Sequence, residues 1–556
     1  MKSSSVIALA GLALAACATP HPTAPAPAPA PAPATVASPV ASGSIPRSSR
    51  AKAPAEWQLL DEASDSLPGL GVLRAERELL SGMQPRQTVL VAVIDGGVDT
   101  AQVDLTPHLW RNPKEVPGNG KDDDHNGYVD DTWGWNFIGG KDGRDVEHET
   151  LEITRLFARC KGIAPLSVGG PDPSAQLCDT VTAEYEKKRA EDTQTLDNIN
   201  NAARAQDRAL QILHAALPDS LTPERVENFH PTDAQQLQAR AVYLQLAGSG
   251  LTPDVVAEAQ KQYESRVRYG YDSTYNPRGI VGDDPANLTQ RDYGNRDVMG
   301  GDALHGTHVS GIIGATPDAA DSVRGIAQSV RIMMVRTIPD GDERDKDVAN
   351  AIRYAVDNGA RVINMSFGKP YSPQKSVVDD AVKYADAHGV LMIHAAGNDG
   401  KDIDAGGNFP TPVYLDGGVA KNWIEVGATS WKGGPALVAS FSNFGQKRVD
   451  VFAPGEDILS TIPGNKYQRD SGTSMAAPMV TGLAALMLSY YPNLSAADVK
   501  RIILQSASRY PSQMVTKPGT GADATLVPFG TLSATGGIVN AYAALRMAGS
   551  DQAGKQ

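Results

Sequence analysis

Three residues of this chain have the types and neighbours that nucleophilic catalysis by a serine requires. Asp95 ends the aliphatic run Val89–Ile94, His305 opens a segment rich in glycine and small residues, and Ser474 follows a glycine and a threonine. A serine hydroxyl is a weak nucleophile until an imidazole takes its proton, and the imidazole needs a carboxylate to fix its tautomer. Together the three residues predict acyl transfer through a covalent serine ester.

Two kinds of local structure are expected to position these side chains. The run that ends at Asp95 predicts a buried parallel strand, and open α/β sheets place their sites at the carboxyl ends of such strands. Small residues after His305 let a helix begin close to the sheet, with the histidine at its entrance. The apolar stretch through Leu488 predicts another helix, whose N-terminal N–H groups can stabilise an oxyanion beside Ser474.

The three segments resemble the catalytic blocks of the subtilisin family, in that family's order of Asp, His and Ser. A fourth segment, Val390–Asp399, resembles the family's strand that ends in an asparagine. The resemblance implies that Asn398 and the Ser474 backbone N–H donate to the oxyanion. Taken singly, each motif is more often a turn, a cap or a common tripeptide, but four in order favour catalysis.

The segment Arg361–Gly368 resembles the family's edge strand, which pairs with an extended substrate. Pairing of this kind favours unfolded or loop polypeptide over folded protein. The resemblance implies a primary specificity region of moderate apolar preference. Its expected substrate-binding residues are Ser366, Phe367, Gly368, Ala395, Ala396 and Gly397.

The resemblance also implies a three-layer α/β fold with a mostly parallel sheet, here interrupted by an α-helical insertion. Asp95 and His305 are 210 positions apart, whereas relatives typically need only a few tens. We place the insertion at residues 145–284, between the parts of a peptidase domain at 55–144 and 285–547. Its apolar stripe is more often a packing face than a binding groove, although the insertion is placed to overhang the cleft. The stripe comprises Leu196, Ile199, Ala203, Leu210, Leu213 and Leu217, with Gln206 interrupting it.

The amino terminus predicts a signal peptide of the lipoprotein type over residues 1–16. Lys2 precedes a short apolar stretch, and Leu14–Cys17 resembles the bacterial lipoprotein box. The resemblance implies that cleavage leaves Cys17 as an acylated terminus and membrane anchor. Ala18 favours the outer membrane of a Gram-negative cell. A plain signal peptide cut near residue 16 or 18 is the alternative.

Residues 17–54 form an Ala/Pro-rich stretch that predicts an extended tether without a core. The following stretch, up to the first strand, is short for the globular propeptide of many relatives. Either the chain folds without a removable chaperone segment, or Trp57–Leu80 wraps the domain. Zymogen control by propeptide removal is therefore not expected. Residues 548–556 are predicted to be a flexible tail.

Cys160 and Cys178 are the only other cysteines. In an oxidising periplasm they are expected to form a structural disulfide. Two free thiols are the alternative.

The acidic segment Asp122–Asp131 resembles the first nine positions of a calcium loop, with oxygen ligands on alternate positions and a glycine at the turn. Trp133 stands where the bidentate Glu of an EF-hand belongs, so the loop is incomplete and a solvated acidic turn is the alternative. We expect a structural calcium ion and no cofactor in catalysis itself. The predicted ligands are Asp122, Asp124, Asn126, Asp130 and the carbonyl of Tyr128.

Composition and charge agree with a large globular protein and exclude one class of partner. The chain has 556 residues, of which 41% are hydrophobic and 21% charged. Its net charge of −13 and the lack of a basic run argue against nucleic acid. The expected partners are polypeptide substrates and, through lipidated Cys17, a membrane, and the protein is expected to be a monomer.

The sequence thus predicts a secreted, membrane-tethered serine endopeptidase that works through an acyl-enzyme. The alternative is a surface-tethered binding or scaffold protein with a gated or inactive protease fold. Within the enzyme class, broad degradation and the processing of one envelope protein both stay open.

Overall fold

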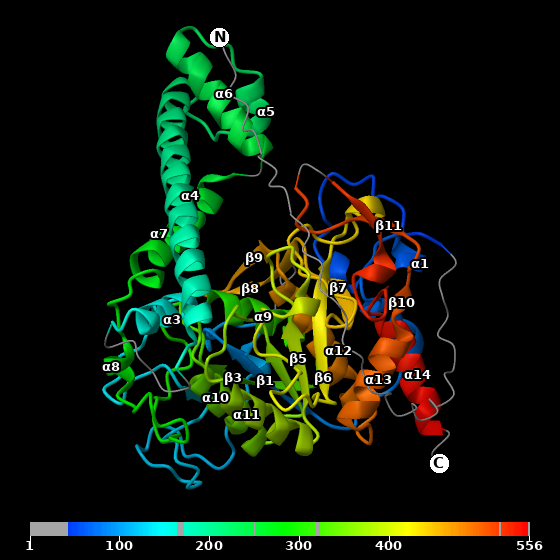
Figure 1. Cartoon of the computed structure of the whole chain (residues 1–556). Helices are drawn as coiled ribbons and strands as arrows, with labels where there is room; N and C mark the ends of the chain where they lie inside the picture. The colour runs from blue at the N-terminus through cyan, green and yellow to red at the C-terminus, as the bar shows by residue number, and fades with distance from the viewer. Residues whose placement is uncertain (1–42, 164–171, 250, 318–322, 522–523, 554–556) are drawn as a thin grey trace, which may run out of the picture. The chain divides into compact units, whose positions relative to one another are not determined.

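A nine-stranded sheet lies at the centre of the chain (Figure 1). This computed structural model describes residues 43–163, 172–249, 251–317, 323–521 and 524–553, so Cys17 and the predicted signal peptide lie outside the described residues. Neighbouring strands are parallel, except that β10 (Ser508–Arg509) is antiparallel to β13 (Gly537–Ile538). In spatial order the strands are β10 (Ser508–Arg509), β13 (Gly537–Ile538), β7 (Val451–Pro454), β6 (Trp423–Thr429), β5 (Leu391–Ala395), β4 (Val362–Met365), β1 (Val89–Asp95), β3 (Val330–Arg336) and β2 (Gly134–Asn136).

Strand β1 shows why the sequence lacks a polar alternation here. Val91 and Val93 belong to the apolar cluster on one face of the sheet, and Ala92 and Ile94 belong to the cluster on the other face. A strand covered on both faces must be apolar at successive positions, which is the pattern of a parallel sheet. The predicted three-layer α/β fold is confirmed.

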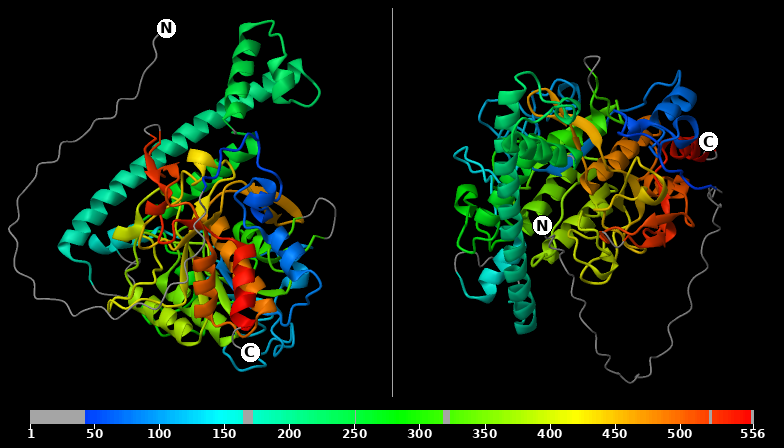
Figure 2. Two further views of the ribbon diagram at one scale, coloured as in Figure 1. Left: turned by 90° about the vertical axis from the view of Figure 1, so that its right-hand side faces the viewer. Right: turned by 90° about the horizontal axis from the view of Figure 1, so that it is seen from above.

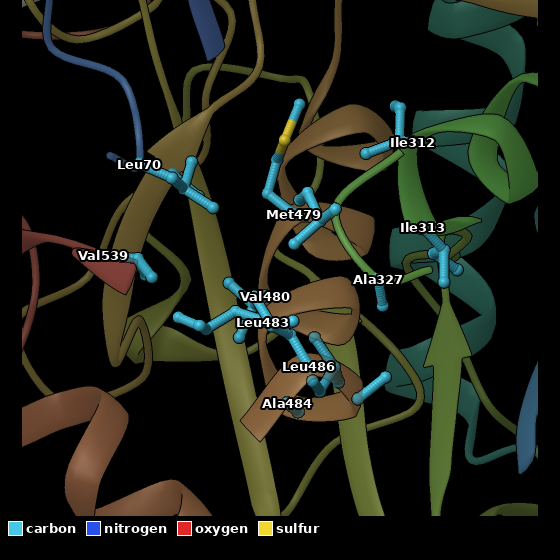
Figure 3. Packing of buried hydrophobic residues seen from close by; sticks show 14 of the residues in the cluster. Leu70, Ile312, Ile313, Ala327, Met479, Val480, Leu483, Ala484, Leu486 and Val539 are labelled. Atoms are coloured by element: carbon cyan, nitrogen blue, oxygen red, sulfur yellow. The ribbon is translucent and has the colours of Figure 1, made fainter. Parts of the chain in front are cut away.

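Helices cover both faces of the sheet, as Figures 1 and 2 show. One face carries α9 (Leu304–Gly314), α12 (Thr473–Tyr490), α13 (Ala496–Ser506) and α14 (Ala541–Ala553), and the other carries α10 (Asp345–Asp357) and α11 (Lys375–Ala387). Met479, Val480 and Leu483 of α12 pack close to Ile312 and Ile313 of α9 (Figure 3). Among the described residues, α12 is the one helix long and apolar enough to cross a membrane, and it is buried in this core.

The segment before β1 wraps around the sheet and its helices, which we call the α/β body. Trp57 and Leu70 are fully buried in the same cluster as α12. Trp57 Nε1 donates to the Glu456 carbonyl at 3.1 Å, and the Ala541 N–H donates to the Leu70 carbonyl at 2.7 Å. Trp57–Leu80 is therefore part of the folded body, in agreement with the wrapping alternative. Its elements are η1 (Trp57–Leu59), α1 (Glu62–Asp65), α2 (Val72–Ala75) and η2 (Glu76–Leu80).

Both predicted ends of the folded chain need correction. Ile45, expected in the tether, is buried in an apolar cluster, and its N–H donates to Gln513 Oε1 at 2.8 Å. Ala548, expected in a flexible tail, is fully buried, and α14 continues through Ala553. An Ala/Pro-rich composition and a small-residue terminus gave no sign of these contacts, because each depends on a partner far away in the chain.

The chain between β2 and α9 holds the predicted insertion, which is helical. Thr222 and Thr252 are N-caps of two of its helices, since their hydroxyls accept from the N–H groups of Arg225 and Val255. The helices are α3 (Glu152–Cys160), α4 (Ala175–Ala216), α5 (Pro223–Glu227), α6 (Ala234–Gly248), α7 (Pro253–Ser265), η4 (Arg266–Gly270) and α8 (Arg278–Val281).

The outer end of α4 forms its own small core with α5 and α6, and in Figures 1 and 2 this end projects away from the sheet. Leu213 of the predicted stripe is fully buried there, beside Ala209. Gln206, which interrupts the stripe, is also buried, and its Nε2 donates to the Leu251 carbonyl at 2.9 Å. The outer part of the stripe, with Leu213 and Leu217, is thus a packing face, whereas Leu196, Ile199 and Ala203 are only half-buried.

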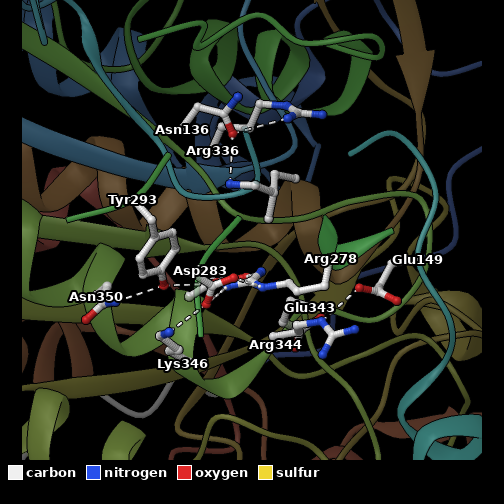
Figure 4. A network of polar contacts seen from close by, with 12 residues as sticks. Asn136, Glu149, Arg278, Asp283, Tyr293, Arg336, Glu343, Arg344, Lys346 and Asn350 are labelled. Atoms are coloured by element: carbon white, nitrogen blue, oxygen red, sulfur yellow. Dashed lines mark hydrogen bonds and ion pairs between the residues drawn. The ribbon is translucent and has the colours of Figure 1, made fainter. Parts of the chain in front are cut away.

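Buried charges fasten the base of the insertion to the α/β body. Arg278 Nη1 lies 2.6 Å from Asp347 Oδ2 of α10, and its Nε lies 2.5 Å from Asp283 Oδ1. Lys346 of α10 reaches the same Asp283 at 2.6 Å (Figure 4). All four side chains are at most 5% exposed, so each charge depends on its partners for compensation.

A disulfide joins the first two helices of the insertion. Cys160 ends α3 and Cys178 lies in the first turn of α4, with 5.4 Å between their Cα atoms. The predicted pairing is therefore present. Cross-linking a loop of this length stabilises a fold by about 3 kcal/mol in the chain-entropy description.

Smaller elements complete the body. Two hairpins pair antiparallel, and four short 3-10 turns connect the strands. These elements are β8 (Ile458–Ile462) with β9 (Lys466–Asp470), β11 (Met514–Thr516) with β12 (Leu526–Pro528), η3 (Thr106–His108), η5 (Ile403–Ala405), η6 (Gly434–Ala436) and η7 (Phe529–Thr531).

Candidate active site

Strand β1 and helix α9 bring Asp95 and His305 together. Asp95 is the last residue of β1, His305 is the second residue of α9, and His305 Nδ1 lies 2.8 and 3.0 Å from the two carboxylate oxygens of Asp95. Gly306 permits this approach, because a Cβ there would lie 2.1 Å from the Gly97 carbonyl oxygen. The predicted helix entrance close to the sheet is therefore observed, and Nδ1 is committed to the carboxylate.

The surroundings of His305 favour its protonated form. Burial alone would lower the pKa of the imidazole, but the charge of Asp95 and its hydrogen bond outweigh this effect. Asp470 and Asp302 add further negative charge, and the pKa of His305 is raised to about 9. Since a general base must be neutral, this site can accept a proton most readily at alkaline pH.

Ser474 lies at the start of α12, as predicted, and contacts the end of β4. Its Oγ donates to the Ser366 carbonyl at 3.1 Å, and the Ser366 hydroxyl donates to the Ser474 carbonyl at 2.9 Å. A hydroxyl donates a single proton. Ser474 must therefore release the Ser366 carbonyl before it can donate to an imidazole.

Two potential donors flank a small space beside Gly472. A Cβ on Gly472 would lie 3.4 Å from Asn398 Nδ2 and 3.5 Å from the Ser474 N. Asn398 Oδ1 accepts from the Thr473 N–H at 2.8 Å and from its hydroxyl at 3.0 Å, which orients the amide. The Nδ2 group is thereby left for a substrate oxygen, and glycine at position 472 keeps the space open. Sequence reasoning noted Thr473 before Ser474 but missed that it orients the Asn398 amide.

A cavity of about 500 Å³ adjoins these groups. Ser474, Thr473 and Asn398 line it together with five of the six predicted substrate-binding residues: Ser366, Phe367, Gly368, Ala395 and Gly397. The sixth, Ala396, does not line the cavity. It is fully buried in an apolar cluster below, because successive residues after β5 point in opposite directions.

Sequence reasoning missed several cavity residues that come from distant parts of the chain. Asn408 and Asp342 lie on loops of the α/β body. Six others belong to the insertion: Leu151, Ile153, Lys188, Gln262, Arg266 and Tyr271. No local motif marks these residues, since only the fold of the insertion brings them to the cavity.

The predicted calcium ligands do not converge as a set. The oxygens of Asp122 accept from the Asn126 and Gly127 N–H groups. Asp130 accepts from the N–H groups of Asn119 and Gly120 and pairs with an arginine. These two carboxylates hold the turn itself, and neither belongs to the group of converging carboxylates in this loop.

A different group of carboxylates meets in the same loop. Ligand oxygens of Glu115, Asp124 and Asp131 lie within 4.8 Å of one another. Glu115 is 6% exposed, and its Oε2 has no hydrogen-bond partner within the described part of the chain. Three converging carboxylate oxygens, one of them buried and unpartnered, fit a hard cation such as Ca²⁺. Asp124 is the one residue shared with the predicted set.

Comparisons with known proteins agree with this geometry. A model of the subtilase family matches residues 86–531. The thermophilic serine proteinase of Bacillus sp. (strain AK1) is 41% identical over 206 residues, which are 37% of this chain and 47% of that protein. The major intracellular serine protease of Bacillus subtilis (strain 168) is 35% identical over 37% of this chain and 61% of its own length. The matched part of the chain thus spans about half the length of these relatives.

Two solved structures are also similar in sequence. A serine-to-alanine mutant of the protease domain of PatA is 29% identical and covers 45% of this chain and 82% of its own, with a TM-score of 0.35. A cold-adapted subtilisin-like serine proteinase is 29% identical and covers 43% and 77%, with a TM-score of 0.34. The family match extends over most of the chain and contains Asp95, His305, Asn398 and Ser474, so this chain belongs to the subtilase family.

Proposed function

We propose that this protein is a serine endopeptidase that hydrolyses peptide bonds through an acyl-enzyme. The observation that carries the proposal is a serine at a helix N-terminus that lines one cavity with an oriented amide, in a chain that also holds an imidazole against a carboxylate. His305 Nδ1 lies 2.8 Å from Asp95, and Ser474 and Asn398 line one cavity. The three groups match the roles of nucleophile, base and oxyanion donor.

Ser474 is the nucleophile and His305 the general base. Because Nδ1 of His305 is held by Asp95, Nε2 is the nitrogen that takes the serine proton. Asp95 stabilises the imidazolium that forms, and His305 then gives the proton to the leaving amine. Water attacks the ester in the second half of the reaction, and the same base activates it.

Asn398 Nδ2 and the Ser474 N–H hold the oxygen that becomes negative in the tetrahedral intermediate. Both flank the space beside Gly472, and Thr473 fixes the amide. Ser366–Gly368 offers backbone groups to an extended substrate, whose side chain enters the adjoining cavity. Attack breaks the contact of the Ser474 hydroxyl with the Ser366 carbonyl.

The competing function is a binding or scaffold protein with an inactive protease fold. To separate the two, the full chain is treated with a serine-directed fluorophosphonate and assayed on unfolded casein. We expect labelling at Ser474 and cleavage, both lost in Ser474→Ala and both kept in Ser550→Ala, whose serine is exposed on α14. A folded wild type that neither reacts nor cleaves would favour the scaffold protein.

We also propose that the loop of residues 112–131 holds a structural calcium ion. Glu115, Asp124 and Asp131 supply the converging carboxylates. The ion offsets their mutual repulsion and stabilises the loop, and it takes no part in catalysis.

Calorimetric titration of the full chain with CaCl₂ tests this site, together with the rise in Tm on adding calcium. Asp131→Asn is expected to abolish the rise, whereas Asp122→Asn is expected to keep it, because Asp122 accepts backbone N–H groups instead. The reverse result would restore the ligands expected from the sequence. An unchanged Tm in the wild type would exclude the site.

We propose finally that the protein is tethered to the bacterial outer membrane through acylated Cys17. The support is the sequence alone: a signal peptide, a lipoprotein-like box and an Ala/Pro-rich stretch. Detergent phase partitioning and mass spectrometry of the N-terminal peptide test it. Cys17→Ser should move the protein to the aqueous phase, and an unmodified cysteine in the wild type would refute the anchor.

A further inference from the structure

The insertion forms one wall of the cavity beside Ser474. Six residues of the insertion line the cavity, and we call them the insertion wall: Leu151, Ile153, Lys188, Gln262, Arg266 and Tyr271. They come from the start of α3, from α4, from α7 and from η4 with the residue that follows it. Helices between Asp95 and His305 in sequence thus contribute directly to the site.

Packing holds this wall in place. Leu151, Ile153 and Tyr271 share an apolar cluster with Tyr185 of α4. The Tyr185 hydroxyl donates to the Tyr271 carbonyl at 2.7 Å, and the Leu151 N–H donates to the Gly270 carbonyl at 3.0 Å. The insertion wall is therefore held in place by packing and backbone hydrogen bonds. A substrate side chain that enters the cavity meets fixed groups.

The wall brings two cations to the cavity. Lys188 pairs with Glu184 at 3.1 Å, and Arg266 Nε pairs with Asp192 at 3.4 Å. Neither acid lines the cavity, and each already accepts a tyrosine hydroxyl, from Tyr371 and Tyr271 respectively. A lysine has three N–H donors and an arginine has five, so both cations keep donors for another carboxylate.

The other charged groups of the cavity have partners of their own or face solvent. Lys369 is buried and lies 2.7 Å from Glu152 and 2.8 Å from Asp345. Lys401 and Asp399 lie 3.8 Å apart and are both more than 60% exposed. Asp342 Oδ2 accepts the Glu152 N–H at 2.7 Å. Lys188 and Arg266 have acidic partners too, so what they offer a substrate carboxylate is their remaining N–H donors.

We propose that the insertion makes this endopeptidase selective for an acidic side chain at the residue whose carbonyl is attacked, with Lys188 and Arg266 as the specificity-determining residues. This inference rests on the proposed peptidase function and specifies its substrate class. A carboxylate in the cavity forms charge-assisted hydrogen bonds to both cations, whereas a neutral isostere does not. The preference expected from the body alone is apolar, so the insertion changes what the site takes.

Matched fluorogenic peptides that differ only at this residue test the proposal with the full chain. We expect kcat/KM to be higher for Glu than for Gln. The Glu-to-Gln ratio should fall about threefold in Lys188→Gln or Arg266→Gln and about tenfold in the double variant, because partly exposed ion pairs are worth roughly 0.2–1 kcal/mol each. The Leu peptide should change little, and 1 M NaCl should reduce the ratio in the wild type.

Lys187→Gln and Arg268→Gln are the matched controls, since both cations are exposed neighbours that do not line the cavity. A wild type that cleaves Gln as fast as Glu would overturn the selectivity and leave the peptidase function standing. A ratio that the two wall variants share with the controls would also overturn it. Where a variant does not fold, the wild-type ratio and its salt dependence decide. Absence of cleavage of every peptide, with no labelling of Ser474, would overturn both proposals.

Discussion

The α/β body and the insertion use different physical means to hold their side chains. Every residue of β5 and β6 is buried, whereas the 42-residue helix α4 buries only Val181, Tyr185, Gln206, Ala209 and Leu213. The body fixes Asp95, His305 and Ser474 from three layers of apolar packing. In the insertion, buried ion pairs fasten the base to the body, and a disulfide joins the first two helices. Its outer end has a core of its own.

Because of this difference, the body and the insertion should tolerate substitutions differently. Apolar packing is shared by many neighbours, so the body should unfold as one unit. Buried charges depend on particular partners, and removing one partner leaves the other uncompensated. The outer end of α4 has few neighbours, and its opening need not disturb the sheet.

A matched pair of cavity-forming changes gives the largest expected contrast. Leu483 and Leu213 are both fully buried, one in α12 and one in α4. Leu483→Ala should cost about 4–5 kcal/mol of global unfolding free energy, and Leu213→Ala about 2–3, because the small outer core can partly collapse. Hydrogen exchange should show the second loss only in α4–α6. Equal and global losses would mean that the two regions fold as one.

Breaking the buried ion pairs at the base of the insertion should lower the free energy of unfolding nearly as much as Leu483→Ala does. Arg278→Met leaves Asp347 and Asp283 with less compensation, and we expect a loss of about 3–5 kcal/mol in urea unfolding. Arg204→Met, on the exposed face of α4, should change stability by less than about 0.5 kcal/mol. A small effect of Arg278→Met would show that the remaining ion pair of Lys346 with Asp283 and apolar contacts suffice to hold the insertion.

Asn398→Ala separates catalysis from stability. Loss of the oxyanion donor should lower kcat about 10²- to 10³-fold, with KM and Tm little changed. Asn201→Ala, on the insertion, should leave kcat unchanged. Steady-state kinetics on a peptide substrate and a thermal melt measure both effects. A fall in Tm that parallels the fall in kcat would assign Asn398 a structural role instead.

The smallest expected effect concerns the charge around His305. Its pKa is raised to about 9, partly by Asp302, which pairs with Lys261 of the insertion at 3.1 Å. The neutral imidazole is the active form, so kcat/KM should fall as the pH drops below this pKa. Asp302→Asn should lower the pKa and move the acidic limb to lower pH by about half a unit or less, because these side chains are exposed and screened. Lys261→Gln should move it the opposite way.

Local pattern predicted the parts of the site that lie within single segments. The aliphatic run that ends in Asp95 predicted a buried parallel strand, and the N-caps at Thr222 and Thr252 follow from residue type. The acidic loop that contains Asp122 and Asp130 shows the limit of this reasoning. Alternation pointed to Asp122 and Asp130, but their oxygens are used by nearby backbone N–H groups.

The sequence by itself determined the order of the catalytic segments and the α/β class through their resemblance to the subtilisin family. It determined the helical nature of the insertion through residue type and short-range periodicity. Only the tertiary structure decided that Lys188 and Arg266 line the cavity beside Ser474, that Glu115 joins Asp124 and Asp131, and that Ile45 and Ala548 belong to the folded body. The physical reason is that each of these contacts joins segments far apart in the chain, and the packing that brings them together leaves no mark on the local pattern.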